Sequence, residues 1–289
     1  MPPKSKFRIS LRLLRPHQWI KNLLLFSPLF FSGNLIDPSL YITCLGVIVF
    51  SLISGLGYIL NDWIDREKDR FHPDKQNRPF CSGAVTGCDA IVLSSALCFI
   101  LVSMLLIFNF PGKFILYLAA YFVLTVSYSL YLKKKIILEI FTIAFGFVLR
   151  ILAGGAVSSV AISSWLFLTV FFIAMMISIA KRVNELKELG TDIAEKHRES
   201  QVGYSLNFLN PMLWSCGSVT LVVYGLYAVE HSDLVVYSVL PATYGIFRFI
   251  FLSDLGKGSD PIKLFFSDRQ LLLTALIFFL FLTIVIYAS

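Results

Sequence analysis

Residues 40–69 read LYITCLGVIVFSLISGLGYILNDWIDREKD, a long apolar run that passes without a break into a cluster of carboxylates. About 20 consecutive apolar residues cross the ~30 Å hydrocarbon core of a bilayer as an α-helix. Residues 40–60 supply such a run with no charged side chain. Charge beside hydrocarbon is unfavourable unless it serves a purpose. The stretch therefore predicts a membrane-spanning helix with a functional, charged end.

The rest of the chain repeats this apolar pattern. Its 289 residues are 57% hydrophobic and 15% charged, with a mean hydropathy of +0.76, whereas soluble domains carry about 25% charged residues. The apolar blocks are continuous rather than alternating, which excludes a β-barrel. We predict an all-α integral membrane protein, a single domain over 1–289, with about nine spans: 19–36, 40–60, 90–110, 114–132, 136–157, 162–180, 211–229, 234–252 and 271–288.

The basic residues predict an orientation. The net charge is +7, and of 25 lysines and arginines all but Lys113, Arg150 and Arg248 fall on one side of the predicted membrane. Because basic loops stay inside, the N-terminus is expected in the cytoplasm and the C-terminus outside a cell (inner) membrane. Topology accounts for this charge, so we expect no nucleic-acid partner. The long charged loops 61–89 and 181–207 are then cytoplasmic and are expected to carry the function.

Two smaller features concern the N-terminus and the cysteines. Residues 1–18 form a basic amphipathic segment expected at the inner surface, with no cleavable signal. The cysteines have no metal-binding spacing, and we expect free thiols: Cys44, Cys81, Cys88, Cys98 and Cys216.

The carboxylate cluster predicts a metal site. If the helix continues past residue 60, Asn61, Asp62, Asp65 and Asp69 share one face, because they are spaced by three and four residues. Carboxylates at this density repel one another unless a cation lies among them, and hard oxygen ligands suit Mg²⁺. The alternative is a solvated helix end with basic neighbours on the same helix.

Cations follow this cluster in the sequence. Lys75, Arg78, Pro79 and Gly83 lie a few residues downstream. Paired cations beside a metal-carboxylate site are typical of a diphosphate clamp, because they neutralise the phosphate oxygens that the metal leaves free. Taken alone, the same run could equally be a basic loop that sets topology.

Together the two stretches resemble the UbiA superfamily of intramembrane prenyltransferases. The pattern Asn-Asp-x-x-Asp-x-x-x-Asp is met at Asn61, Asp62, Asp65 and Asp69. The resemblance implies a bundle of nine helices around a central cavity, with the site closed by the inner loops.

The second inner segment differs from most of that family. Members that alkylate aromatic acceptors carry a second aspartate-rich motif after span six, whereas this chain has Lys181 and Arg182 there. Glu188 and Asp192 are the alternative candidates for a second metal site. The pattern is instead similar to the decaprenyl-phosphate phosphoribosyltransferase branch, with further matches at 15–22, 128–133, 146–155 and 261–269. One departure is Glu139, where that branch leads us to expect aspartate.

The resemblance implies a reaction and a set of site residues. A 5-phosphoribosyl group would move from phosphoribosyl diphosphate to a polyprenyl phosphate, with Mg²⁺ at Asn61, Asp62, Asp65 and Asp69. Catalytic roles are implied for the three aspartates with Lys181 and Arg182. Substrate-binding roles are implied for Lys21, Asn61, Lys75, Arg78, Tyr128, Lys133, Glu139, Arg150, Glu185, Arg198 and Tyr204.

Several alternatives stay open at this stage. Arg150 and Arg248 lie within spans and are either buried structural ion pairs or contacts to a substrate phosphate or a carboxylate such as Glu139. The rival enzyme is a UbiA-type prenyltransferase with an aromatic or quinone-precursor acceptor. A transporter would need polar residues threading the whole membrane, and the number of copies in a homo-oligomer is undetermined.

Overall fold

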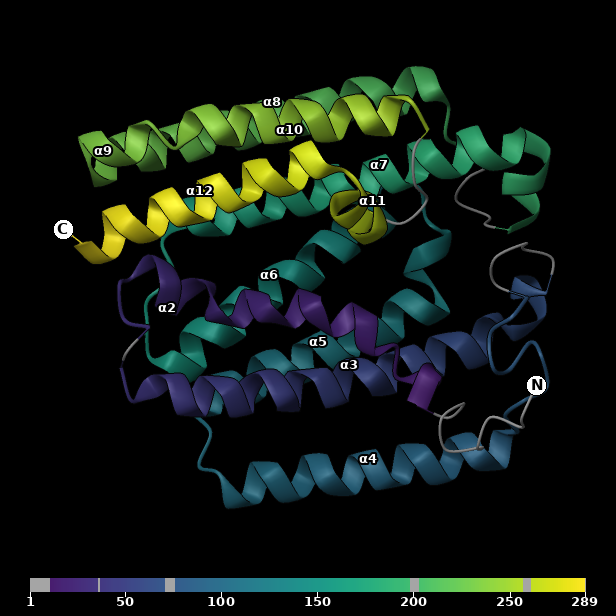
Figure 1. Cartoon of the computed structure of the whole chain (residues 1–289). Coiled ribbons are helices and arrows are strands. Elements are labelled where there is room, and N and C mark those ends of the chain that lie inside the picture. Colours follow the sequence, from purple (N-terminus) through teal and green to yellow (C-terminus); the bar gives the residue numbers. More distant parts are fainter. Residues whose placement is uncertain (1–10, 36, 71–75, 198–202, 257–260, 289) are drawn as a thin grey trace. The chain divides into compact units, whose positions relative to one another are not determined.

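The computed structural model describes residues 11–35, 37–70, 76–197, 203–256 and 261–288, and every regular element in these ranges is a helix (Figure 1). Within these ranges, eight segments are long and apolar enough to cross a membrane, which confirms the all-α membrane class. The elements are η1 (Pro16–Phe26), α2 (Ser27–Phe31), α3 (Ser39–Asp69), α4 (Gly87–Ile107), α5 (Gly112–Leu130), η2 (Leu132–Lys134), α6 (Leu138–Ser158), α7 (Ser164–His197), α8 (Leu206–His231), α9 (Asp233–Val236), α10 (Val239–Asp254), α11 (Pro261–Ser267) and α12 (Arg269–Ala288).

The first predicted span, 19–36, is not a single α-helix. It consists of the 3₁₀-helix η1 followed by the short α2. Pro28 has no N–H to continue a helical ladder and is tolerated in the first turn of a new helix, so the α-helix restarts at Ser27. At about 2.0 Å per residue for η1 and 1.5 Å for α2, the pair covers about 30 Å, the thickness of a bilayer core.

The second inner segment is also different from the prediction. Residues 181–207 were expected to be a loop, but α7 continues as a helix to His197. Half of residues 182–197 are Glu, Lys, Leu or Ala, which favour helix over loop. A similar continuation of α3 to Asp69 was predicted and is confirmed.

Contacts divide the chain into two compact units, each described by itself. The first comprises residues 1–30, 34–133 and 149–161, and the second comprises 31–33, 134–148 and 162–289. Helix α6 contributes to both. The single domain and the central cavity stay predictions.

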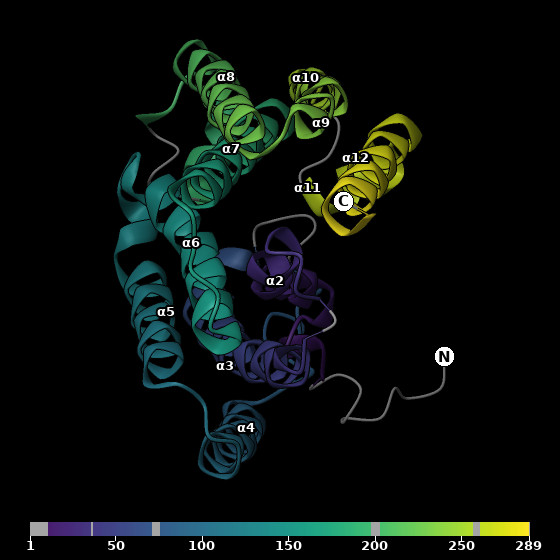
Figure 2. The same cartoon turned by 90° about the vertical axis from the view of Figure 1, so that its left-hand side faces the viewer.

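In the first unit, α3 lies between η1 and α4 and also packs against α5 (Figures 1 and 2). Its apolar core contains the fully buried Leu25, Phe50 and Phe114. A polar network crosses this core. The Arg150 guanidinium donates to Asn22 Oδ1 and to the Tyr121 hydroxyl, both at 2.9 Å, and the Asn22 amide donates to Ser51 Oγ at 2.9 Å. The network therefore ties η1 to α3, α5 and α6.

In the second unit, α7 packs against α8, and α10 packs against α7, α8 and α12. Arg248 on α10 donates to both oxygens of Asp268, at 2.7 and 3.3 Å. Asp268 also accepts from the backbone N–H of Leu271 at 2.8 Å and so caps α12. The hydrogen bond from Arg248 holds the pKa of Asp268 below its usual value. Arg248 is therefore held as an ion pair that joins two helices.

The described part of the N-terminal segment packs into the first unit. Leu13 and Leu14 are buried in a cluster with Ile59, Phe80 and Leu97, and the position of 1–18 at the membrane surface stays a prediction. Residues 1–10 are outside the described ranges. All five cysteines are free thiols, as predicted.

The contact between α6 and η1 gives a test of the packing. A Cβ at Gly154 would overlap the carbonyl oxygen of Leu25, whereas a Cβ at Gly225 on α8 would meet nothing within 4 Å. We predict that Gly154→Ala lowers the unfolding temperature in detergent, because overpacking costs about 1–3 kcal/mol. The control Gly225→Ala should leave it unchanged or raise it, because alanine favours helix by about 1 kcal/mol. Equal unfolding temperatures for the two variants would contradict this packing.

Candidate active site

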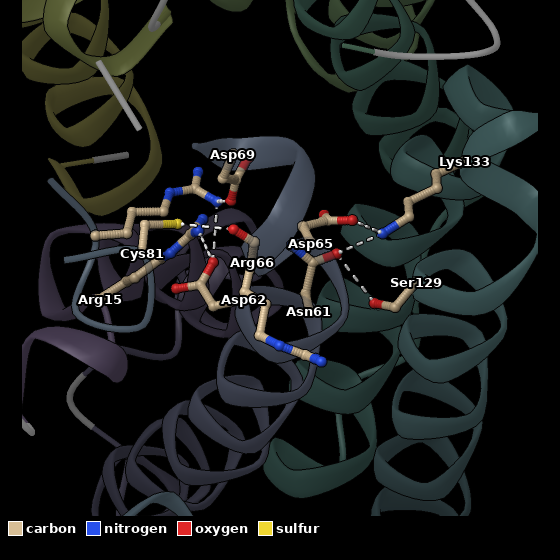
Figure 3. Close-up of polar contacts among 10 residues, drawn as sticks. Arg15, Asn61, Asp62, Asp65, Arg66, Asp69, Cys81, Ser129 and Lys133 are labelled. Carbon is tan, nitrogen blue, oxygen red and sulfur yellow. Dashed lines mark hydrogen bonds and ion pairs between the residues drawn. The ribbon is translucent and has the colours of Figure 1, made fainter. Parts of the chain in front are cut away.

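The carboxylate-bearing end of α3 forms the centre of the first unit's polar site. Asn61, Asp62, Asp65 and Asp69 fall within one side of the helix, as their spacing predicts. Figure 3 shows that they divide into two pairs: Asp62 and Asp69 point one way, and Asn61 and Asp65 point toward Lys133 and Ser129.

The first pair is held by two arginines. Arg78 donates to Asp62 Oδ1 at 3.0 Å and also forms an ion pair with Asp69. Arg15 pairs with the same Asp62 oxygen. Asp62 is only 3% exposed, and a buried carboxylate requires such partners. Asp62 and Asp69 are therefore neutralised by arginines of the protein itself.

The segment after α3 brings Arg78 back to the helix. Phe80 is buried and packs edge-on against Trp63 with ring centroids 5.4 Å apart. The backbone N–H of Val85 donates to the Pro79 carbonyl at 3.2 Å, and Gly83 takes a positive φ of 69° that glycine adopts without strain. This tight turn folds the chain onto α3 and delivers Arg78 to Asp62.

The second pair is held by α5 and η2. Lys133 lies 2.5 Å from Asp65 Oδ1 and 3.5 Å from Asn61 Oδ1, and Ser129 Oγ donates to Asn61 Oδ1 at 3.2 Å. Lys133 is 8% exposed. Its ammonium group therefore meets both oxygen ligands of this pair, so the sequence-predicted residues Asn61, Asp65 and Lys133 are brought together.

The donor set fits Mg²⁺ chemically, because it consists of three carboxylates and an amide oxygen on one helix face. In the described ranges no three Asp, Glu, His or Cys side chains are arranged around one common point. The three carboxylates instead meet three protein cations, Arg15, Arg78 and Lys133. The charges in this arrangement are balanced.

Arg15 is a site residue that sequence reasoning did not identify. It was counted among the topology-setting charges and lies in the family match at 15–22, but no site role was assigned to it. In the structure its guanidinium pairs with Asp62 and lies 5.3 Å from the centroid of the Tyr58 ring. Its backbone takes a φ of 47°, in the left-handed region. The available signal was its place directly before Pro16, where η1 begins.

A second polar cluster lies in the second unit. Arg182 on α7 is 1% exposed, forms an ion pair with Glu185 one turn further along the helix, and has its Nε 3.6 Å from Glu139 Oε1. Glu139 is fully buried in the first turn of α6, where the helix dipole favours a carboxylate. The structure thus brings three of the sequence-predicted residues together, with the carboxylates of Glu139 and Glu185 both beside the Arg182 guanidinium.

The other predicted residues have separate places. Lys181 is half-buried on α7, Lys21 is half-buried on η1, and Tyr128 is half-buried on α5. The buried Tyr204 accepts a hydrogen bond at its hydroxyl from the Ile137 N–H at 2.7 Å. Lys75 and Arg198 lie outside the described residues.

Arg150 has partners that the sequence did not indicate. It is 4% exposed, binds Asn22 and Tyr121, and lies over the rings of Tyr121 and Phe50 at 4.7 and 5.5 Å. Glu139, its suggested carboxylate partner, pairs with Arg182. These contacts give Arg150 a part in holding the core together, and a substrate-binding role stays a prediction.

Comparisons with known proteins agree with this fold. A family model described as the UbiA prenyltransferase family matches residues 23–282. The chain belongs to the UbiA prenyltransferase family and is a multi-pass membrane transferase.

Two curated relatives share a name. A decaprenyl-phosphate phosphoribosyltransferase of Mycolicibacterium smegmatis is 30% identical, with 93% of this chain and 90% of the relative covered. One of Corynebacterium glutamicum is 26% identical, with 99% and 89% covered. Among solved structures, a UbiA homolog from Archaeoglobus fulgidus bound to DMAPP and Mg²⁺ superposes with a TM-score of 0.74 over 97% of this chain and 99% of that chain, at 17% identity. That likeness shows the fold.

The buried Arg182 cluster gives a prediction about stability. Arg182→Met removes the cation that Glu139 and Glu185 share, and breaking a buried ion pair costs about 3–5 kcal/mol. We expect a clearly lower unfolding temperature in detergent, with partial recovery in Arg182→Met/Glu139→Gln. The control is Arg66→Met, whose pair with Glu67 is exposed on both side chains and should contribute little. No difference between the Arg182 and Arg66 variants would contradict the assignment.

Proposed function

We propose that this protein transfers a 5-phosphoribosyl group from phosphoribosyl diphosphate to a polyprenyl phosphate, releasing diphosphate with the help of Mg²⁺. The observation that carries the proposal is the pair of charged clusters. The three aspartates and three cations of the first cluster supply a diphosphate site. In the second cluster, Arg182 follows span six at the position where a second metal site would require carboxylates. The named relatives, which match over most of their own length, support the same reaction.

The donor diphosphate is proposed to bind at the end of α3. In the structure, Arg15, Arg78 and Lys133 neutralise the three aspartates. A metal ion would take over part of that neutralisation, and Arg78 and Lys133 would then turn to phosphate oxygens, to which they form charge-assisted hydrogen bonds. When bound, Mg²⁺ would offset the negative charge that builds on the leaving diphosphate.

The remaining phosphates need further cations. We assign the half-buried Lys181 to a substrate phosphate, together with Arg198. Arg182 is enclosed by Glu139 and Glu185, so we assign it chiefly to holding these carboxylates in place. Carboxylates accept hydrogen bonds from sugar hydroxyls, which suits a ribose ring beside Glu185.

The acceptor requires little acid–base chemistry. A phosphate monoester is already an anion, so its oxygen can attack C1 of the ribose while the bond from C1 to the diphosphate oxygen breaks. The described site supplies cations and positioning rather than a free general base, which agrees with that need. Direct displacement inverts the configuration at C1.

The alternative is a prenyltransferase that uses an aromatic or quinone-precursor acceptor. The Archaeoglobus fulgidus homolog was solved with DMAPP and with GPP, which are prenyl diphosphates. In that case Glu188 and Asp192, whose side chains lie outside the described set, would be needed for a second metal ion. Their replacement separates the two reactions.

The proposed function predicts metal and donor dependence. Purified protein with labelled phosphoribosyl diphosphate and a polyprenyl phosphate should form a phosphoribosylated lipid, and EDTA should abolish this product. Asp65→Asn should lower turnover by about 100-fold or more, because a charge that stabilises the transition state is lost. The control Asp89→Asn replaces a carboxylate that caps α4 and should retain activity.

Two results would remove the proposal. One is full activity in EDTA. The other is consumption of a prenyl diphosphate with an aromatic acceptor in a reaction that needs Glu188 and Asp192.

We also propose that the N-terminus and both charged clusters face the cytoplasm, because basic residues favour that side. In protein whose other cysteines are replaced by serine, the exposed native Cys88 should react with an impermeant thiol reagent only after permeabilisation of cells. Gly112→Cys, at the first residue of α5 where an added Cβ meets nothing within 4 Å, should react in intact cells. The reverse pattern of labelling would overturn the orientation.

A further inference from the structure

The turn that leads into α6 has an unusual backbone. Ile137 takes a φ of 65°, which is a genuine outlier for a β-branched residue. The Leu138 N–H donates to the Ile136 carbonyl at 2.6 Å, so three residues close a γ-turn with positive φ, a rare and strained form. Strain of this kind persists only where surrounding contacts hold it.

Tyr204 provides such a contact. Its hydroxyl accepts the Ile137 N–H at 2.7 Å, and its ring stacks on Phe208 with centroids 6.4 Å apart. A Cβ at Gly203 would overlap the Ile136 side chain, so the chain before α8 lies directly on the turn. Tyr204 is 6% exposed, and its part-buried hydrogen bond to Ile137 holds the strained residue.

The same connection carries Lys133. This lysine lies four residues before Ile137, where η2 follows α5, and its ammonium reaches Asp65 at 2.5 Å and Asn61 at 3.5 Å. The following Lys134 and Lys135 are exposed. Only residues 134–137 separate Lys133 from the start of α6, and the Glu139 N–H donates to the Lys135 carbonyl within this connection at 3.1 Å. A change in the conformation of the turn is therefore expected to shift Lys133.

We propose that Tyr204 is a positioning residue: it stabilises the strained turn at Ile137, and the turn sets the place of Lys133 against Asp65 and Asn61. This role differs from the direct substrate contact that family resemblance implies for Tyr204. The expected effect on turnover rests on the proposed function, in which Lys133 binds the diphosphate. The expected effect on the position of Lys133 does not depend on that function.

Glycine offers a specific rescue. Tyr204→Phe keeps the ring stacked on Phe208 but removes the acceptor for the Ile137 N–H. Because glycine adopts a positive φ without penalty, Ile137→Gly lets the turn form without that hydrogen bond. The matched control is Ser159→Gly, which relieves another positive φ, of 59°, at the end of α6.

The first measurement is the reaction of Lys133 with an amine-specific reagent, read by mass spectrometry on the full-length protein in detergent. Lys134 and Lys135 serve as internal references because they are exposed. Tyr204→Phe should raise Lys133 labelling about 2- to 10-fold, as expected for one lost hydrogen bond. Ile137→Gly/Tyr204→Phe should return it toward the wild-type level, and Ser159→Gly/Tyr204→Phe should not.

The second measurement is turnover of phosphoribosyl diphosphate by the same variants. Tyr204→Phe should lower kcat/KM about 2- to 10-fold, and Ile137→Gly should restore it in the double variant. A tyrosine that contacts substrate directly would not be rescued by glycine. Unchanged Lys133 labelling in Tyr204→Phe, or equal rescue by Ser159→Gly, overturns the positioning role. If Lys133 labelling changes as expected but the protein transfers no phosphoribosyl group, the positioning role of Tyr204 stands and the proposed function is wrong.

Discussion

Charge at the end of a membrane helix has to be balanced, and α3 carries three aspartates where its apolar span ends. Asp62 is 3% exposed, and an unpaired carboxylate in such a place is strongly unfavourable. Its cations come from Arg15, before η1, and from Arg78, after α3, while Lys133 of η2 balances Asp65. The requirement for balance therefore determines how three separate segments approach α3, and it builds the polar site of the first unit.

Sequence spacing predicted the carboxylate face because helical periodicity is local and depends only on residues 61–69. The cations that balance it were harder to predict, because pairing depends on the tertiary path. Arg15 meets Asp62 across 47 positions of sequence, and no local pattern indicates that approach. Hydropathy likewise predicted the first span at 19–36 but not its 3₁₀ geometry, because hydropathy carries no information on tertiary hydrogen bonds such as those of Asn22 to α3 and α6.

The two arginines within membrane spans, Arg150 and Arg248, also show that sequence does not identify the partner of such a charge. Hydropathy registers that a charge within a span is unfavourable, but it does not identify the partner that compensates for it. Arg248 is balanced by a carboxylate, Asp268. Arg150 is held in part by an amide, a hydroxyl and two aromatic rings. Two residues with one sequence signature thus have different physical solutions, and only the first matches the ion pair considered from sequence.

A site already closed by its own ion pairs must still be able to admit a ligand. The net free energy of a buried ion pair is small, because the desolvation of both ions offsets most of their attraction. Exchanging one ionic partner for another therefore changes the free energy far less than leaving a charge unpaired. Arg78, which bridges Asp62 and Asp69, and Lys133, which bridges Asp65 and Asn61, are bound to groups that a metal ion could take over. The cations that pair with the aspartates are thus the same groups that would bind a diphosphate, and the exchange needs only that metal cation and diphosphate arrive together.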